Sequence, residues 1–402
     1  MLLAAAAGVA LGFLAPEFSE RIQFVSVLFL RLIRSIIAPV LVGVLVRAIA
    51  GAGSLSNLGR LGWKSILYFE AATTIALLLG WFTVLVVRPG KGLSLPSEGV
   101  LQAEPLGFAA ALENAVPTSI IDAMARGDVL QIVVFCFLFG VACLSIGARA
   151  RPVVELADSL AEVAFRYTDY VMYLAPAAVL AAAASTVATS GSAALEGLAR
   201  FVGAAWFAQA LFLLVVLGGS LALASIPLRR FVHFAREPFL IAFATTASAA
   251  ALPQTLENMQ RFGVPKRILG VVAPLSLSLN LNGSTIHLAM ASLFVAQSAN
   301  IELSIERQLL ILLTLKLTSK GVAGIPRANF VILAALFESF GLPMAGLAML
   351  LGVDALIDPV RTSVNVLSHC TAPAVVARWE GSSFRADLEA VKDNGALAES
   401  VG

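Results

Sequence analysis

One apolar segment near the end of the chain carries a regular series of polar side chains. At about 100° per residue in an α-helix, its polar positions fall within a sector of about 80°. The helix would therefore have one polar face and otherwise apolar sides. Because ionisable groups are costly inside a membrane, such a face predicts a path for a charged solute or an ion. The series, spaced at i, i+4, i+7, i+11 and i+15, is Asp354, Asp358, Arg361, Asn365 and His369.

A purely structural role is the alternative for the charged members of this series. Asp358 and Arg361 are three residues apart, so they could neutralise each other as an ion pair within the helix. That interpretation does not explain Asn365 and His369. It also does not explain the other polar interruptions in this part of the chain.

The composition places these residues in a membrane protein. Of the 402 residues, 59% are hydrophobic and 13% are charged, and the mean hydropathy is +0.91; soluble domains have roughly 25% charged residues. Most of the apolar stretches reach the ~20 residues that a spanning helix needs, and the first is a short or tilted span. They are Leu2–Leu14, Phe24–Ile49, Ile66–Val87, Val129–Ile146, Val171–Val187, Phe201–Ile226 and Ile268–Val295, then a crowded region from Leu309 to about Val376.

Basic residues predict how the chain is oriented. If each segment crosses once, four basic clusters fall on one side, which the positive-inside rule makes cytoplasmic. This predicts a multi-pass protein of the cell inner membrane with cytoplasmic amino and carboxyl termini, the latter as a tail over 381–402. The clusters are Arg47, Arg60 and Lys64; Arg149 and Arg151; Arg229, Arg230 and Arg236; Lys266 and Arg267.

Two polar, Gly/Pro-interrupted segments precede the polar helix. Thr245–Pro253 and Thr318–Pro326 both end in proline, and each is followed some 30 residues later by a polar break. The breaks are Asn280–Ser284 and Asp358–Thr362. Since unwound backbone is tolerated at membrane depth only where it lines a cavity or is buried, paired interruptions indicate a transporter binding site. We expect two re-entrant helical hairpins, each followed by a helix; kinked helices are the alternative.

From about Leu2 to Glu380 the chain resembles the dicarboxylate/amino acid:cation symporters, the glutamate transporter family. The resemblance rests on several motifs in the same order. They are Val116–Thr118, Gly127–Phe135, the two hairpin tips, Asn280–Ser284 and Asp358–Asn365.

The resemblance implies an all-α membrane protein with eight transmembrane helices, two re-entrant hairpins and inverted repeats. It also implies a homotrimer in the lipid bilayer that works as an elevator. The implied parts are scaffold helices 1–2 in 1–58, helix 3 of the transport domain in 59–92, scaffold helices 4–5 in 93–192, and the remaining transport domain in 193–380.

The family also implies roles for individual residues in binding an acidic amino acid. Arg361 would hold the side-chain carboxylate, which suits a planar, permanently charged donor. Asp358 would bind the amino group. Ser248, Thr362 and Asn365 would bind the main-chain carboxylate, and Ser284 would line the site. The hairpin tips would be formed by Ala247, Ala249, Gly321, Val322, Ala323 and Gly324.

Several departures from the family point away from sodium. Sodium-coupled members carry carboxylates where this chain has Asn282 and His369, and a hydroxyl where it has Ala72, although Thr73 lies beside it. Amides and imidazoles lack the negative charge that a hard cation prefers. Lys320, an apolar position in sodium-coupled members, would repel or replace a cation.

We therefore expect sodium-independent, proton-coupled transport. Histidine titrates near neutral pH, which makes His369 the leading proton carrier and His287 the second. Asp354 and Glu70 are further acids in the membrane. An uncoupled carrier with neutral histidines is the alternative. The ion-coupling candidates are Asn280, Asn282, His287, Lys320, His369 and Asp354.

Other functions fit the sequence less well. A C4-dicarboxylate carrier is the nearest alternative, and an ion channel would gather its charges in a ring-forming motif instead of on one helix face. An enzyme is not expected, because no His-Glu-x-x-His or Gly-x-Ser-x-Gly motif is present. Three cysteines without paired spacings, and the lone His369-Cys370 pair, predict neither a metal site nor a cofactor. The net charge of +2 gives no indication of a nucleic-acid partner.

Overall fold

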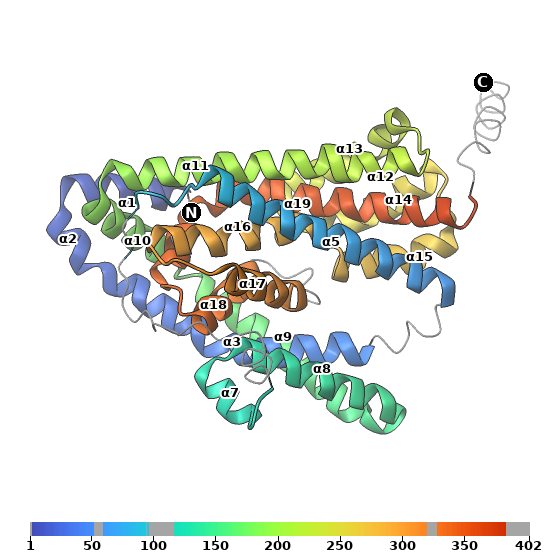
Figure 1. The fold of residues 1–402 in the computed structure, drawn as a ribbon, viewed down its shortest axis with the longest axis horizontal. Helices are drawn as coiled ribbons and strands as arrows, with labels where there is room; N and C mark the ends of the chain where they lie inside the picture. Colours follow the sequence, from blue (N-terminus) through green and yellow to red (C-terminus); the bar gives the residue numbers. More distant parts are fainter. Residues whose placement is uncertain (1, 52–58, 94, 96–115, 320–327, 383–402) are drawn as a thin grey trace, which may run out of the picture.

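The computed structural model describes residues 2–51, 59–93, 95, 116–319 and 328–382, and every regular element in these ranges is helical (Figure 1). The first ten elements are α1 (Leu2–Leu14), α2 (Pro16–Arg21), α3 (Gln23–Gly51), α5 (Gly59–Val87), α7 (Ile120–Arg126), α8 (Val129–Ile146), η1 (Gly147–Ala150), α9 (Arg151–Met172), α10 (Ala175–Ser190) and α11 (Ser192–Leu211). The others are η2 (Phe212–Leu217), α12 (Gly218–Leu223), α13 (Leu228–Thr245), η3 (Ser248–Ala251), α14 (Leu252–Phe262), α15 (Lys266–Leu279), α16 (Asn282–Ser298), α17 (Ile305–Thr318), α18 (Ala328–Phe340) and α19 (Ala345–Trp379).

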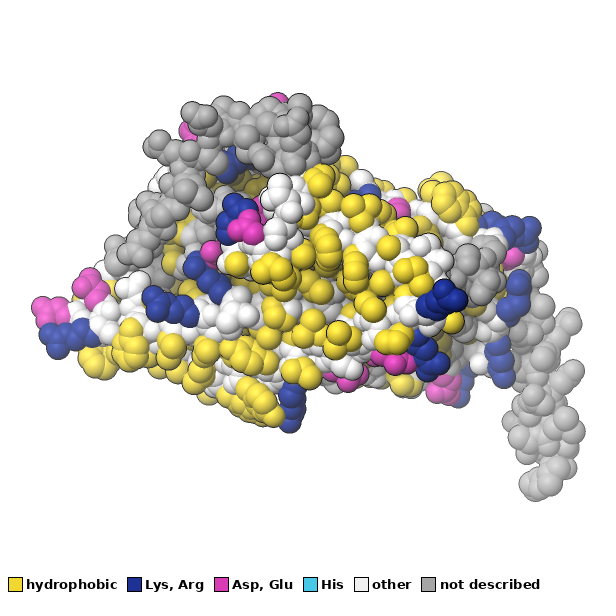
Figure 2. Space-filling view, turned by 90° about the horizontal axis from the view of Figure 1, so that it is seen from below, with side chains coloured by type: hydrophobic (Ala, Val, Ile, Leu, Met, Phe, Trp, Pro, Cys, Tyr) yellow, Lys and Arg dark blue, Asp and Glu magenta, His cyan; other side chains and the backbone are white. Residues whose placement is uncertain are grey.

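The chain is an integral membrane protein. Four helical stretches in the described residues are long and apolar enough to cross a bilayer: Pro16–Arg47, Arg60–Val87, Gln131–Met172 and Leu195–Leu223. Figure 2 shows one face of the molecule with a broad apolar region, and with charged side chains mainly toward its ends. An apolar belt of this kind is the surface that lipid tails accept.

One helix was not among the predicted apolar segments. Helix α9 carries charged, exposed residues along its outer side, which hide its apolar character in the sequence. Its buried side is made of small residues, including Ala157 and Ala161, and it packs closely on Gly43 of α3. In Figure 1, α3, α8 and α9 lie along the lower edge of the molecule.

The first predicted interruption is a helical hairpin. Helices α13 and α14 pack against each other and are joined by a tip over 246–251. Thr246 adopts a left-handed conformation with φ 52°, which ends α13, and Pro253 lies in the first turn of α14. Two contacting helices thus flank this interruption, whereas a re-entrant hairpin stays a prediction.

The second interruption lies between α17 and α18, which also pack together. The predicted tip residues here lie outside the described residues. They are Lys320, Gly321, Val322, Ala323 and Gly324.

The two predicted polar breaks have different outcomes. The first is confirmed, because α15 ends at Leu279 and α16 begins at Asn282. The second, at Asp358–Thr362, interrupts only the apolar sequence, because α19 runs continuously through Pro359, as the prediction of one polar helix face requires. Proline removes one backbone hydrogen bond, and neighbouring hydroxyl groups and packed helices compensate for such losses in membrane helices.

Helix α19 packs against α16, α13, α15 and α10, so its polar face is enclosed by both halves of the chain. Helix α16 is buried along almost all of its length. Helices α1 and α10 pack without intervening side chains, since a Cβ atom at Gly8 would collide with the carbonyl oxygen of Leu180, and one at Gly12 would lie 2.7 Å from that of Ala184. These contacts fix the helices that surround the polar face.

Helix α18 is held at its carboxyl end by α3 and the turn before α8. The Arg34 guanidinium lies 2.9 Å from the Glu338 carboxylate. The Ser339 hydroxyl donates to the carbonyl oxygen of Gly127, at 3.1 Å. Both contacts fix the position of α18 relative to α3 and α8.

Candidate functional site

The polar face of α19 is organised around Arg361, which is 3% exposed. Its Nη1 donates to Asp354 Oδ1 at 2.8 Å, and its Nη2 donates to Asp358 Oδ1 at 2.6 Å. The Asp358–Arg361 pair that we considered as a structural alternative is therefore present. Asp354, one turn further along the same face, joins it.

Arg361 contributes one guanidinium to this group, and Asp354 and Asp358 each contribute a carboxylate to it. Buried charges are stable only when they are paired and hydrogen-bonded. The two ion pairs therefore stabilise the buried guanidinium.

A second set of contacts joins three helices at Ser284, the third residue of α16. The Ser284 backbone N–H donates to Asn365 Oδ1 at 3.1 Å, and Asn365 Nδ2 donates back to Ser284 Oγ at 3.0 Å. Asn329, near the start of α18, also donates its Nδ2 to Ser284 Oγ, at 3.3 Å. Ser284 thus joins α16, α18 and α19.

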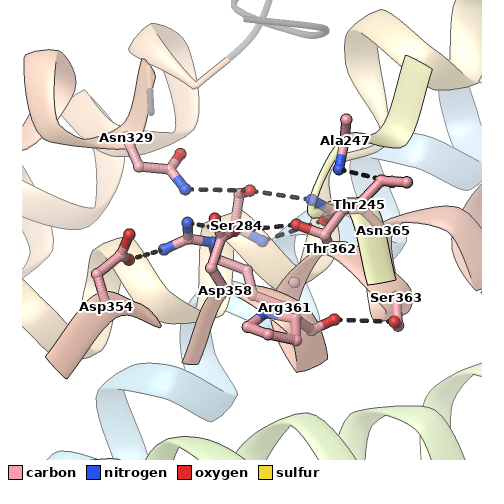
Figure 3. Close-up of polar contacts among 12 residues, drawn as sticks. Thr245, Ala247, Ser284, Asn329, Asp354, Asp358, Arg361, Thr362, Ser363 and Asn365 are labelled. Atoms are coloured by element: carbon pink, nitrogen blue, oxygen red, sulfur yellow. Dashed lines mark hydrogen bonds and ion pairs between the residues drawn. The ribbon is translucent and has the colours of Figure 1, made fainter. Parts of the chain in front are cut away.

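The tip of the first hairpin approaches the same group. Figure 3 shows Thr245 and Ala247 on the side of Ser284 and Asn365 that is opposite to Asn329. Ser248 follows Ala247 directly as the first residue of η3, and Ala249 is exposed. The predicted site residues from the hairpin, α16 and α19 therefore lie in one region.

The predicted site residue Thr362 forms a hydrogen bond within α19. Its hydroxyl donates to Asp358 Oδ1 at 3.0 Å, the same oxygen that accepts from Arg361. Asp358 thus holds two donors in this structure. Binding of a carboxylate by Thr362 would require this hydrogen bond to break.

The site is compact because α16 and α19 touch through backbone. A Cβ atom at Gly283 would collide with the carbonyl oxygen of Arg361 and would lie 3.1 Å from Asn365 Oδ1. Gln209 of α11, which is fully buried, donates its Nε2 to the carbonyl oxygen of Gly283 at 2.8 Å. Gln209 therefore supports the amino end of α16.

Three of the predicted ion-coupling residues, Asn280, Asn282 and His369, belong to a separate buried cluster. Asn282 Nδ2 donates to Asn280 Oδ1 at 2.8 Å and to Ser368 Oγ at 3.1 Å. The hydroxyl of Thr73 donates to Asn282 Oδ1 at 3.4 Å. His369 Nδ1 lies 3.1 Å from Ser276 Oγ, so this histidine belongs to the cluster and not to the Arg361 group. No carboxylate takes part in these contacts among the described residues.

The histidine rings have few partners in the described part of the chain. His369 Nε2 and both ring nitrogens of His287 are buried without a hydrogen-bond partner there. His287 lies beside Phe201, with ring centroids 6.1 Å apart. Proton transfer by either histidine stays a prediction.

Glu70 has a cationic partner that the sequence analysis did not identify. Lys316 of α17 lies 3.1 Å from the Glu70 carboxylate and donates to the Thr74 hydroxyl at 2.9 Å. The pair connects α5 to the first arm of the second hairpin. Glu70 is therefore neutralised by a neighbouring helix.

Sequence reasoning missed Asn329 and Gln209. Asn329 lies only three residues after Pro326, close enough to the predicted tip to have been a candidate. Gln209 is one polar residue inside an apolar run, and an intramembrane polar side chain was the signal that could have identified it.

Known proteins resemble this chain over nearly its whole length. The sequence model of the sodium:dicarboxylate symporter family matches residues 1–379. The proton/glutamate-aspartate symporter of Bacillus subtilis is 36% identical over 393 residues, which cover 96% of this chain and 95% of the relative. The proton/sodium-glutamate symport protein of Geobacillus stearothermophilus is 34% identical over 376 residues, covering 91% and 89%. C4-dicarboxylate transport protein 2 of Ralstonia nicotianae is 37% identical over 406 residues, covering 98% and 91%. These relatives are transporters, not enzymes.

Proposed function

The chain belongs to the sodium:dicarboxylate symporter family, and from this premise we propose that it is a secondary active transporter of acidic amino acids, glutamate or aspartate. The observation that carries the proposal is Arg361, a buried guanidinium held by two carboxylates beside Ser284 and Asn365. A carboxylate of the solute would replace one aspartate on Arg361. A planar guanidinium binds carboxylates through paired hydrogen bonds. A solute carboxylate can therefore form the same kind of contact with Arg361 as the aspartate that it displaces.

An amino acid suits the charge of this site better than a dicarboxylate. Asp354 and Asp358 already place two carboxylates beside Arg361. Glutamate and aspartate bring one net negative charge at neutral pH and an ammonium group that Asp358 can bind, whereas a dicarboxylate brings two negative charges and no ammonium. Like charges confined in apolar surroundings repel strongly.

We propose that coupling is to protons and that sodium is not required. The cluster around Asn282 and His369 uses amide, hydroxyl and imidazole groups, and amide N–H groups point at oxygens that a cation would need. A hard cation prefers charged oxygen ligands. Three candidates can accept the proton: His369, His287, and Asp354, whose carboxylate shares Arg361 with Asp358.

The remaining features follow the family. The proposed protein is a homotrimer of the cell inner membrane with both termini in the cytoplasm. Residues 1–58 and 93–192 form the scaffold, and residues 59–92 and 193–380 form a transport domain that moves as an elevator. Hairpin tips at Ala247–Ala249 and Gly321–Gly324 enclose the solute.

A C4-dicarboxylate carrier is the second candidate, because relatives of that name are equally similar to this chain. The test is uptake by purified protein in liposomes, with sodium, potassium and pH gradients imposed separately. Competition by aspartate and by succinate then separates the two candidates. Uptake of succinate with no competition from aspartate would overturn the amino acid proposal.

A further inference from the structure

The donor and acceptor groups around Ser284 determine which ligand atom its hydroxyl can meet. A serine hydroxyl has one proton to donate and two lone pairs that accept. Ser284 Oγ accepts from Asn365 Nδ2 at 3.0 Å and from Asn329 Nδ2 at 3.3 Å. Both lone pairs are thus occupied. Within the described residues, the hydroxyl donates no hydrogen bond.

The orientation of the Asn365 amide follows from a backbone contact. The Ser284 N–H can only donate, and it lies 3.1 Å from Asn365 Oδ1. The oxygen of this amide must therefore face the backbone, which turns its nitrogen toward Ser284 Oγ. One lone pair of the hydroxyl is filled by α19 for this reason.

The second lone pair is filled from α18, by a residue that the sequence analysis did not consider. Asn329 lies at the second position of α18, and the far end of this helix is held by the Arg34–Glu338 ion pair at 2.9 Å. Nine residues of helix, about 14 Å, separate Asn329 from that ion pair. The amide of Asn329 therefore reaches Ser284 from an arm that is fixed at its other end.

We infer that Asn329 is a positioning residue that makes the Ser284 hydroxyl a donor only, so that this part of the site accepts a carboxylate and rejects an amide. A carboxylate presents only acceptor oxygens, which suit a free hydroxyl proton. An amide NH2 of a solute would find no lone pair and would be left unpaired in a buried place, which is costly. The inference rests on the proposed function, since it assumes that an acidic solute binds beside Ser284.

The experiment compares solutes that differ from aspartate in one group. L-Asparagine replaces the side-chain carboxylate by an amide, and L-isoasparagine replaces the main-chain carboxylate, so one of them reports whichever group lies at Ser284. Binding of all three is measured by calorimetry on the full-length purified protein. The readout is the ratio of dissociation constants, amide over acid, which does not depend on the fraction of folded protein.

Two replacements of similar size remove the donor. Asn329→Leu leaves one lone pair of Ser284 free, so the ratio for one of the amides should fall about tenfold, the effect of one hydrogen bond. Asn329→Asp offers only acceptor oxygens, so it takes up the Ser284 proton and should weaken binding of the acid more than Asn329→Leu does. Asn329→Gln keeps a primary amide and should restore part of the wild-type ratio.

Asn258→Leu is the matched control. Asn258 is 4% exposed, lies in α14 and donates to the carbonyl oxygen of Phe234 at 3.0 Å. Its replacement removes a buried amide without touching Ser284, so the ratio should not change.

The outcomes separate the inference from the proposed function. If the wild type binds neither aspartate nor glutamate, the proposed function fails. If the wild type binds aspartate, and the dissociation-constant ratios of both amides over aspartate are the same in Asn329→Leu as in the wild type, the inference alone is overturned. Unchanged aspartate binding in Asn329→Asp would also overturn it, because an acceptor at position 329 would then do equally well.

Discussion

Arg361 and Asp354 form an ion pair across seven residues of one helix, with Nη1 2.8 Å from Oδ1. The side chains of these two residues are 3% and 8% exposed, whereas that of Asp358, the second partner of Arg361, is 18% exposed. Asp358 is therefore the carboxylate that a solute reaches more easily. Asp354 is the more buried counter-ion of Arg361, so in the proposed function it would keep Arg361 paired when a solute displaces Asp358.

Replacing Arg361 by alanine should abolish uptake of aspartate and glutamate. The change removes the buried guanidinium that pairs with Asp354 and Asp358, and breaking a buried ion pair by removing one partner costs about 3–5 kcal/mol. Uptake into liposomes and thermal unfolding would measure both consequences. Arg200→Ala is a control, since Arg200 is half-exposed and pairs with Glu196 on its own helix. Unchanged aspartate affinity in Arg361→Ala would contradict the site assignment.

Asp358→Asn should weaken binding of amino acids but not of succinate. The neutral amide cannot form an ion pair with the ammonium group of the solute. Leaving a buried charged partner unpaired in this way should weaken the binding free energy by about 2–5 kcal/mol. Asp354→Asn is the matched comparison on the same helix face. Calorimetric titration with aspartate and with succinate gives both constants. An unchanged aspartate constant in Asp358→Asn would mean that Asp358 only neutralises Arg361.

Accumulation of substrate should be independent of sodium and should increase with an inward proton gradient. The reason is the cluster around Asn282 and His369, which has no carboxylate among its described contacts. Uptake at fixed membrane potential would be measured in the wild type, in His369→Gln and in Asp354→Asn. Sodium-stimulated uptake would contradict the whole proposal. Proton-driven uptake that survives in His369→Gln would exclude only that histidine.

Gly283→Ala should destabilise the protein and weaken binding together. The added methyl group meets the carbonyl oxygen of Arg361 and Asn365 Oδ1, so α16 and α19 must separate. Overpacking of this kind typically costs about 1–3 kcal/mol. Gly270→Ala is the control, because a Cβ atom at Gly270 in α15 would meet nothing within 4 Å. Equal melting temperatures of the two variants would contradict this packing.

Glu380, directly after the end of α19, should make stability depend on acid pH. Hydrogen bonds from Arg60 and then Lys64 lower the pKa of its carboxyl group from 4.5 to about 2. Since the folded pKa is the lower one, the stabilisation is complete above pH 4.5 and is lost as the pH falls toward 2. Thermal unfolding of Glu380→Gln should show less pH dependence in this window than the wild type. Glu257→Gln, which removes an exposed pair with Arg261, should behave as the wild type does.

The arrangement within single helices was predictable from the sequence. The 3.6-residue period brings Asp354, Asp358 and Arg361 to one face, and the structure shows them in contact. The break before Asn282 was also predictable, since Asn280, Asn282 and Gly283 interrupt an apolar run. These features depend only on residues close in the chain.

Contacts between helices could not be derived in the same way. The hydrogen bonds from Asn329 and Gln209 to α16 depend on how three helices pack together. No pattern of neighbouring residues in the sequence indicates that packing. Helix α9 was missed because its charged outer side lowers the hydropathy of the whole segment.

The contact between α1 and α10 also determines which substitutions the amino-terminal helix can tolerate. Gly8 and Gly12 are the buried positions in the described part of α1, and both face the backbone of α10. In saturation mutagenesis, these two positions should reject even alanine, whereas exposed neighbours such as Ala6 and Ala10 should accept most apolar residues. Variation in this helix is therefore governed by the space at two glycines and not by its hydrophobicity.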